Sequence, residues 1–260
     1  MGGWSYAGRW ALVTGASAGI GEAFARALAG RGMHVALSAR REDRLRELAE
    51  ELRSAHSVET AVLPADLSGP GAASGLWSMA TAGGRSMSLL VNNAGFGLRG
   101  EFTELPLDRQ QEMLRLNCAV PMELMHLALA AGTTGIINVA SIAGYQPVPT
   151  MAAYSASKAF LLTLSEAVAE EMRGTSTRIV TVNPGPVATE FQRVAGTSVT
   201  RRTLGLRTPE QVVGAALRTL EAGGGTVVPG LTNRLSAVVV RVAPRSLVLK
   251  VAKKMMKSFR

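Results

Sequence analysis

Short apolar runs rich in β-branched residues alternate with longer amphipathic segments along most of the chain. The short runs predict strands at Trp10–Thr14, His34–Ser38, Glu59–Leu63, Leu89–Val91, Gly135–Val139, Arg178–Val182 and Thr226–Val228. Apolar residues at the 3.6-residue period predict helices at Gly19–Arg31, Glu42–Ser54, Asp108–Ala131, Ala152–Arg173 and Pro209–Ala222. This alternation predicts an α/β fold, a single-domain Rossmann-type doubly wound parallel sheet of about seven strands flanked by helices.

The pattern is not equally clear everywhere. The helix that should cross over within residues 68–88 is weakly specified, because this segment is rich in Gly, Ser and Ala. By contrast, the helix at Pro209 has a clear start, since Thr208 and Gln211 can form a capping box around a proline at the first helical position. No repeat or linker divides the chain, so residues 1–230 are predicted to form one catalytic domain and residues 231–260 a tail.

The tail has a regular charge pattern from Ser246 onward. Projected at about 100° per residue, the cations gather on one side and the apolar residues on the other, which predicts a basic amphipathic helix. The cations are Lys250, Lys253, Lys254, Lys257 and Arg260. Two interpretations remain open: residues 246–260 lie on an anionic membrane surface, or their apolar side packs on this subunit or an oligomer partner.

Composition and charge narrow the class of protein. The chain has 260 residues, of which 47% are hydrophobic and 18% charged, as in soluble globular proteins. The net charge of +9 belongs to the C-terminus, because residues 1–200 carry 16 Lys and Arg against 17 Asp and Glu, and the remainder 12 against 2. This argues against a nucleic-acid partner. The single Cys118 allows no internal disulfide and no metal-ligand spacing, and neither an export signal nor a membrane span is expected, so the sequence predicts a cytoplasmic protein without a metal.

The segment from Ala11 to Gly21 predicts a phosphate-binding turn between the first strand and the first helix. Gly15 permits the tight turn, and Gly19 and Gly21 remove side chains so that a pyrophosphate can approach the backbone N–H groups of a helix N-terminus. Ser17 and Ile20 lie within the same turn and are included in the predicted dinucleotide site.

The end of the second strand predicts which dinucleotide binds. An acidic residue at this place would hold the ribose 2′-hydroxyl, but the sequence has Arg40 and Arg41 and no carboxylate. Guanidinium groups can pair with a 2′-phosphate, so NADP(H) is favoured over NAD(H). For Arg41 an equally simple role is to solvate the start of the next helix.

Tyr154 and Lys158 stand four residues apart on a predicted helix, which places both side chains on one face. A phenol is a weak acid and base near neutral pH, and a neighbouring ammonium lowers its pKa. The pair is therefore a candidate for proton transfer.

Five separated motifs in the same order resemble the short-chain dehydrogenase/reductase family from Arg9 to about Val228. They are TGASAGIG (14–21), NNAG (92–95), Ser141, YSASK (154–158) and NPGPVAT (183–189). The resemblance implies that Tyr154 transfers the proton, that Lys158 tunes it and holds the nicotinamide ribose, and that Ser141 binds the substrate oxygen. Asn117, just before Pro121, is similar to the family's fourth member, which seats a water in a proton relay toward Lys158.

The resemblance also implies the remaining contacts to the dinucleotide. Those at the adenosine are Asp66, Leu67, Asn93, Ala94 and Gly95; those at the nicotinamide are Pro184, Gly185, Val187 and Thr189, besides Tyr154 and Lys158. Structural alternatives remain open. Asp66 can cap the next segment, Asn92 can brace neighbouring strands, and Ser141 and Asn117 can satisfy local backbone groups.

The segments that follow the predicted strands suggest a moderately apolar substrate. Val148, Met151, Phe191 and Val194 are candidates for its pocket, whereas Arg201 and Arg202 could meet an acidic group or simply be solvated. The sequence therefore predicts an NADP(H)-dependent oxidoreductase that moves hydride to or from a carbonyl or alcohol carbon. The alternative is a catalytically weak NADP(H)-binding redox sensor or membrane-surface scaffold. Family resemblance implies a homodimer or homotetramer.

Overall fold

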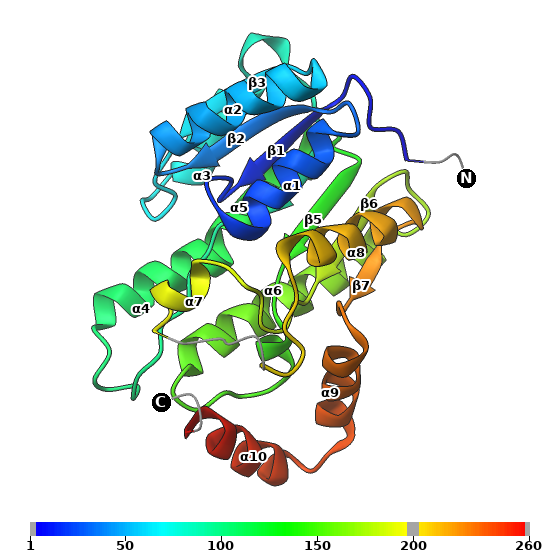
Figure 1. Cartoon of the computed structure of the whole chain (residues 1–260). Helices are drawn as coiled ribbons and strands as arrows, with labels where there is room; N and C mark the ends of the chain where they lie inside the picture. The colour runs from blue at the N-terminus through cyan, green and yellow to red at the C-terminus, as the bar shows by residue number, and fades with distance from the viewer. Residues whose placement is uncertain (1–3, 197–202, 258–260) are drawn as a thin grey trace.

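The computed structural model describes residues 4–196 and 203–257, which form a single parallel sheet flanked by helices (Figure 1). The strands are β1 (Trp10–Thr14), β2 (His34–Ala39), β3 (Thr60–Pro64), β4 (Met87–Asn92), β5 (Gly135–Val139), β6 (Arg178–Val182) and β7 (Gly225–Val227). Their order is β3-β2-β1-β4-β5-β6-β7, so the direction of winding reverses between β1 and β4. The doubly wound parallel sheet predicted from the sequence is confirmed.

Helices cover both faces of the sheet (Figure 1). One face carries α1 (Gly19–Ala29), α2 (Glu42–His56) and α8 (Pro209–Glu221); the other carries α3 (Ala72–Thr81), α5 (Val120–Ala130) and α6 (Ala152–Glu171). Alternate strand residues supply two cores: Val13 belongs to the first cluster and Leu12 to the second, and both are fully buried. Burial on both faces explains why the strands are nearly continuous apolar runs.

The weakly specified crossover and the well-specified helix start both form. Helix α3 occupies residues 72–81 and buries Ala73, Leu76 and Ala80 against the core. At α8, the Gln211 N–H donates to Thr208 Oγ1 at 3.4 Å and the Thr208 N–H donates to Gln211 Oε1 at 3.2 Å. The predicted capping box is therefore confirmed, and α3 shows that tertiary contacts can supply what local propensity lacks.

The long helix predicted at Asp108–Ala131 is confirmed, and it contains a widened turn. The structure has α4 (Leu107–Leu114), a π-helical turn η2 (Arg115–Ala119) and then α5. Pro121 has no N–H to donate to the preceding turn, and its ring crowds that turn, so the helix widens there. The widened turn contains Asn117, one of the predicted catalytic residues.

The C-terminal residues form two helices where one was predicted. Helix α9 (Leu231–Val242) precedes α10 (Arg245–Lys257), the helix expected from Ser246 onward. Among the described residues, no helix combines the length and apolarity that crossing a membrane would require. Phe259 and Arg260 of the predicted tail, and the pair Arg201 and Arg202, lie outside the described residues. Short helices complete the fold: η1 (Ala82–Gly84), η3 (Ile142–Tyr145) and α7 (Phe191–Val194).

Candidate active site

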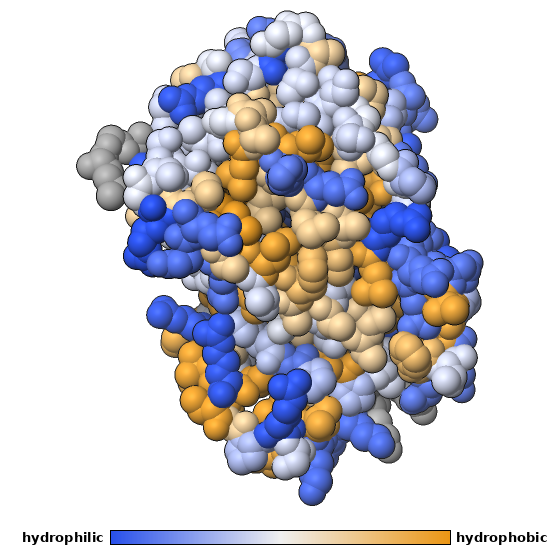
Figure 2. Space-filling view, turned by 180° about the vertical axis from the view of Figure 1, so that it is seen from behind, coloured by the Kyte–Doolittle hydropathy of each residue, from blue (hydrophilic) through white to orange (hydrophobic). Residues whose placement is uncertain are grey.

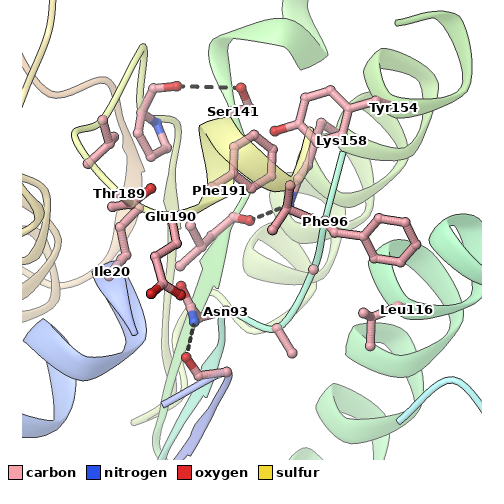
Figure 3. A pocket seen from close by; sticks show the side chains of 18 of the residues that line it. Ile20, Asn93, Phe96, Leu116, Ser141, Tyr154, Lys158, Thr189, Glu190 and Phe191 are labelled. Carbon is pink, nitrogen blue, oxygen red and sulfur yellow. Dashed lines mark hydrogen bonds between the residues drawn. The ribbon is translucent and has the colours of Figure 1, made fainter. Parts of the chain in front are cut away.

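A crevice of about 600 Å³ opens at the carboxyl ends of the strands, around the point where the strand order reverses. Open α/β sheets bind ligands at this place because loops diverge from neighbouring strands there. Each predicted dinucleotide residue except Gly21 lines the crevice, as do Ser141, Tyr154 and Lys158. Figure 3 shows the last three on one side of the cavity and Ile20 and Thr189 on the other.

The glycine turn after β1 is built by backbone conformation and by Asn93. Gly15 has φ 68° and Gly19 has φ 60°, a region that favours glycine. The Asn93 amide donates to the Thr14 carbonyl at 2.8 Å and to the Gly15 carbonyl at 3.2 Å (Figure 3). A Cβ at Gly19 would lie 3.0 Å from the Thr189 side chain, so the glycine turn and the segment after β6 are in close contact here.

Gly21 has a different role from the one predicted. It does not line the crevice, and a Cβ there would lie 2.2 Å from the Gly15 carbonyl oxygen and 2.5 Å from the Asn93 amide. The missing side chain lets α1 approach the turn closely. The backbone space at Gly21 is thus used for packing.

We expect Gly21→Ala to lower the free energy of unfolding by about 2 kcal/mol, the usual cost of overpacking a tight site. Urea unfolding followed by circular dichroism measures the change. The matched control is Gly75→Ala in α3, where a Cβ would meet no atom within 4 Å, and this control should be neutral or stabilising because alanine favours helix. Equal stability of Gly21→Ala and the wild type would contradict the packing role.

The adenosine end of the crevice carries a cluster of charges. Arg40 and Arg41 follow β2 and are both exposed, and Asp66 follows β3, where its Oδ1 accepts from the Ser68 N–H at 2.9 Å. The Ser68 backbone and side chain hold the pKa of Asp66 below its usual value. Asp66 therefore caps its own loop and also lines the crevice, so both interpretations of this residue describe its position.

Arg41 is engaged by two crevice residues. Its Nε donates to Ser17 Oγ at 3.2 Å, its Nη2 donates to the Ser17 carbonyl at 3.1 Å, and the same nitrogen pairs with Glu190 at 3.1 Å. Arg41 therefore connects the glycine turn to the segment after β6 rather than only solvating the start of α2. Glu190 was not predicted as a site residue, because nothing in the sequence indicates that it meets Arg41.

The NNAG motif divides into structural and crevice-lining residues. The Asn92 amide donates to Asn138 Oδ1 at 2.9 Å and to the Pro121 carbonyl at 3.3 Å, which braces β4 against β5 and α5. Of the two readings of Asn92, the structural one is thus correct. Ala94 and Gly95 line the crevice, where a Cβ on Gly95 would meet Asn117 Oδ1 at 2.6 Å.

Ser141, Tyr154 and Lys158 converge at the inner end of the crevice (Figure 3). Ser141 follows β5, and its Oγ accepts from the Ala143 N–H at 3.1 Å as the cap of η3. Tyr154 and Lys158 lie in the first turns of α6, are 7% and 6% exposed, and point to the same side. The Lys158 ammonium donates to the Val139 carbonyl at 2.9 Å and lies 6.0 Å from the centre of the Tyr154 ring.

Burial controls the ionisation of both residues. It raises the pKa of Tyr154 to about 12, and the hydrogen bond with Ser141 lowers it in part. It lowers the pKa of Lys158 to about 8, against a smaller effect of Cys118. The predicted lowering of the Tyr154 pKa is therefore wrong, because loss of solvation raises it. At neutral pH the phenol keeps its proton and can donate it.

Lys158 should make the stability of the protein depend on pH. Between about pH 8 and the ordinary lysine value of 10.5, the unfolded chain binds the proton and the folded one does not, so stability rises with pH. The full rise is about 3 kcal/mol, and below pH 8 the cost of the buried charge is fully present. Urea unfolding at pH 7 and pH 10.5 should show that the free energy of unfolding of the wild type gains this increase with pH and that Lys158→Met lacks it. A pH-independent difference between the two proteins would contradict the burial effect.

Asn117 lies behind the crevice rather than on its wall. It is 1% exposed; its Nδ2 donates to the Phe96 carbonyl and to Ser157 Oγ, both at 3.0 Å, while its Oδ1 accepts from the Phe96 N–H at 3.3 Å. These bonds join η2 to the loop after β4 and to α6. The position of Asn117 fits the local interpretation, and its predicted part in a proton relay stays a prediction.

The end of the crevice that is predicted to hold the nicotinamide is shaped by the segment after β6. Four residues that were predicted to contact the dinucleotide line the crevice here: Pro184, Gly185, Val187 and Thr189. A Cβ at Gly185 would lie 2.6 Å from the Asn233 side chain of α9, which is 4% exposed. Asn233 is a supporting residue that sequence analysis missed, because α9 itself was not predicted.

An apolar pocket adjoins Tyr154. Phe96, Met113, Val148, Met151 and Tyr154 form one buried cluster, and the Phe191 ring lies 5.7 Å from the Tyr154 ring. The four residues predicted for the substrate pocket, Val148, Met151, Phe191 and Val194, all line the crevice. Besides Glu190, the polar lining residues that were not predicted are Glu112, Gln146 and Gln192. Within the described residues, no group of three or more His, Cys, Asp or Glu side chains could hold a metal ion.

Comparisons with known proteins agree with this geometry. The family model for short chain dehydrogenases matches residues 9–199. The chain is 34% identical over 186 residues to the 7beta-hydroxysteroid dehydrogenase of Collinsella aerofaciens, covering 70% of each protein. It is also 34% identical over 223 residues to the very-long-chain 3-oxoacyl-CoA reductase of Anas platyrhynchos, covering 82% of this chain and 69% of that relative.

A solved structure extends the likeness to nearly the whole chain. The short-chain dehydrogenase from Sphingobium yanoikuyae in complex with NADPH superposes with a TM-score of 0.80 at 28% sequence identity. The match covers 97% of this chain and 96% of that one.

Proposed function

The chain belongs to the short-chain dehydrogenase family, and we propose that it is an NADP(H)-dependent oxidoreductase acting on a carbonyl or alcohol of a moderately apolar substrate. The single observation that carries this proposal is the convergence of Ser141, Tyr154 and Lys158 on a crevice that the glycine turn also lines. A phenol that keeps its proton, a hydroxyl and a buried ammonium at one place are what reduction of a carbonyl needs.

The residues present fit a nicotinamide dinucleotide. Gly15 and Gly19 line the crevice without side chains at the N-terminus of α1, whose N–H groups attract phosphate. The bound dinucleotide would supply the hydride. Ser141 would donate a hydrogen bond to the carbonyl oxygen, and Tyr154 would give that oxygen its proton, while Lys158 would hold the nicotinamide ribose.

Preference for NADP(H) is supported by the charges at the end of β2. Arg40 and Arg41 line the crevice there, and neither residue position carries the carboxylate that would hold a free ribose hydroxyl. Arg41 already pairs with Glu190, so its guanidinium would have to bind Glu190 and a 2′-phosphate at the same time. Arg40 makes the simpler phosphate ligand.

An apolar substrate is supported by the pocket around Tyr154 and by the relatives. Phe96, Val148 and Met151 offer hydrocarbon surface, and the activities of the two relatives concern a hydroxysteroid and a very-long-chain 3-oxoacyl-CoA. Glu112 and the two glutamines give the pocket a polar side that could orient a substrate hydroxyl or amide.

We further propose a homodimer or homotetramer in the cytoplasm, with peripheral contact of residues 246–260 with a membrane. Figure 2 shows a broad apolar area on the face that is turned away from the viewer in Figure 1. The helices of that face expose Met122 in α5 and Phe160 in α6, at 42% and 39%. Such an area favours association of subunits.

The test is NADPH oxidation with a panel of steroid ketones, 3-oxoacyl thioesters and simple aryl ketones. We expect turnover that depends on Tyr154 and is faster with the bulky substrates than with acetone. If NADPH binds but no substrate of the panel is reduced in a Tyr154-dependent way, the binding-protein alternative, a redox sensor or membrane-surface scaffold, replaces the enzymatic one.

A further inference from the structure

Helix α9 exposes an apolar stripe to solvent, and only Asn233 and Ala237 of this helix are buried. Projected at about 100° per residue, its exposed large residues fall within an arc of about 100°. They are Leu231, Leu235, Val238, Val239 and Val242, which are 80%, 62%, 54%, 49% and 79% exposed. Asn233 and Ala237 point the other way and are 4% and 7% exposed. Helices of soluble proteins normally turn the apolar stripe to the core, so this stripe marks an interaction surface.

The charged residues of α9 and α10 themselves are all of one sign, although Arg241 pairs with Glu166 of α6 at 3.8 Å. Residues 231–257 contain no Asp or Glu, and their cations are Arg234, Arg241, Arg245, Lys250, Lys253, Lys254 and Lys257. On α10 only Val248 and Ala252 are buried among the residues whose side chains are described, while Leu247 and Val251 are 53% and 49% exposed. In Figure 2, strongly polar and apolar side chains lie next to each other at the lower end of the molecule, where Figure 1 places α9 and α10.

This combination fits an anionic lipid surface better than a second copy of the chain. Apolar side chains flanked by cations can enter the boundary between headgroups and acyl chains, while the cations meet lipid phosphates. A twofold interface through the same surface would instead bring like charges together, because α9 and α10 carry seven cations and no acidic residue.

The inner side of α9 supports the wall of the crevice. The Asn233 amide donates to the Gly205 carbonyl at 2.9 Å and to the Pro229 carbonyl at 3.0 Å, and it abuts Gly185. The Arg241 guanidinium lies 4.8 Å from the centre of the Tyr145 ring, in the short helix that begins after Ser141. Helix α9 therefore supports the crevice wall with its inner side and exposes the apolar stripe on its outer side.

We propose that α9 and α10 together form a docking surface for an anionic bilayer, through which an apolar carbonyl substrate dissolved in lipid reaches the crevice. Only the delivery of the substrate rests on the proposed oxidoreductase function; the docking surface does not. Docking through α9 goes beyond the basic tail, because it places the crevice wall, and not merely a terminal helix, next to the lipid.

Binding of the full-length protein to vesicles tests the docking surface. The protein should sediment with vesicles that contain phosphatidylglycerol, less with pure phosphatidylcholine, and less at high salt. Leu235→Glu with Val239→Glu should lower the vesicle partition coefficient by about tenfold or more. The double variant loses two apolar side chains that would enter the lipid, and it gains two negative charges that the anionic headgroups repel. The matched control replaces Phe102 and Leu107, two exposed apolar residues that are distant in the sequence from α9 and α10, with Glu. This control should sediment like the wild type.

Two results would overturn the docking surface. The first is equal sedimentation of the α9 double variant and the wild type. The second is a wild type that ignores anionic vesicles while the double variant shifts to a smaller assembly in size-exclusion chromatography, which would assign the surface to a second copy. Circular dichroism checks that the double variant remains folded, as expected for substitutions at exposed positions.

Turnover with two ketones tests delivery from the bilayer. Anionic vesicles should raise the rate of NADPH oxidation with a long-chain ketone dissolved in them, and the α9 double variant should lose that increase. Both proteins should reduce a water-soluble aryl ketone at the same rate. If neither ketone is reduced by either protein, the proposed function fails while the sedimentation result still decides the docking surface. An equal increase for both proteins overturns delivery.

Discussion

Tyr154→Phe is expected to lower kcat/KM for ketone reduction by about 10³-fold, the usual contribution of a positioned general acid. The phenol is nearly buried, burial keeps its proton in place with a pKa of about 12, and its hydroxyl points toward Ser141 in Figure 3. Phenylalanine keeps the ring that packs on Phe191 and removes only the hydroxyl. Steady-state NADPH oxidation with a bulky ketone measures the loss, which should fall mainly on kcat.

The control separates chemistry from architecture. Tyr145 in η3 is a nearby, half-buried tyrosine that does not line the crevice. Tyr145→Phe removes its hydroxyl and should leave kcat/KM nearly unchanged. NADPH affinity, measured by fluorescence titration, should be equal in the wild type and Tyr154→Phe. Retention of full activity by Tyr154→Phe would exclude this phenol as the proton donor.

Arg40→Ala together with Arg41→Ala is expected to reduce the preference for NADPH over NADH by about a hundredfold. Each cation that meets a 2′-phosphate contributes a charge-assisted hydrogen bond of about 1.5–3 kcal/mol, and NADH has no such phosphate to lose. The ratio of kcat/KM for the two cofactors with one ketone measures the change. Most of the loss should appear in KM for NADPH, since the adenosine end lies far from the reacting atoms.

The single variants and a neighbouring arginine refine this expectation. Arg41 also bonds Ser17 and pairs with Glu190, so Arg41→Ala should weaken binding of both cofactors in part, whereas Arg40→Ala should act on NADPH alone. Arg44→Ala removes an exposed cation of α2 that pairs with Glu47, outside the crevice lining, and serves as the control. An unchanged cofactor ratio in the double variant would contradict a phosphate site at the end of β2.

The elements that sequence analysis predicted well are those whose cause is local. Strand β1 buries Leu12 in one core and Val13 in the other, and the resulting apolar run can be recognised without a structure. The cap of α8 is likewise a short-range pattern of Thr208, Pro209 and Gln211. Helix α3 was poorly specified because it is stabilised by burial of Leu76 against the core, which a local pattern does not contain.

The alternation of strands and helices, the order of the five motifs, and hence the family and the residue types of the crevice, could be predicted without coordinates. How those residues are used became visible only in the folded chain. Gly21 packs a helix, Asn92 braces strands, Glu190 meets Arg41, and α9 turns its apolar side outward. The physical reason is that spacing along the chain encodes contacts within one element, whereas burial, desolvation and pairing depend on which distant segments the folded sheet brings together.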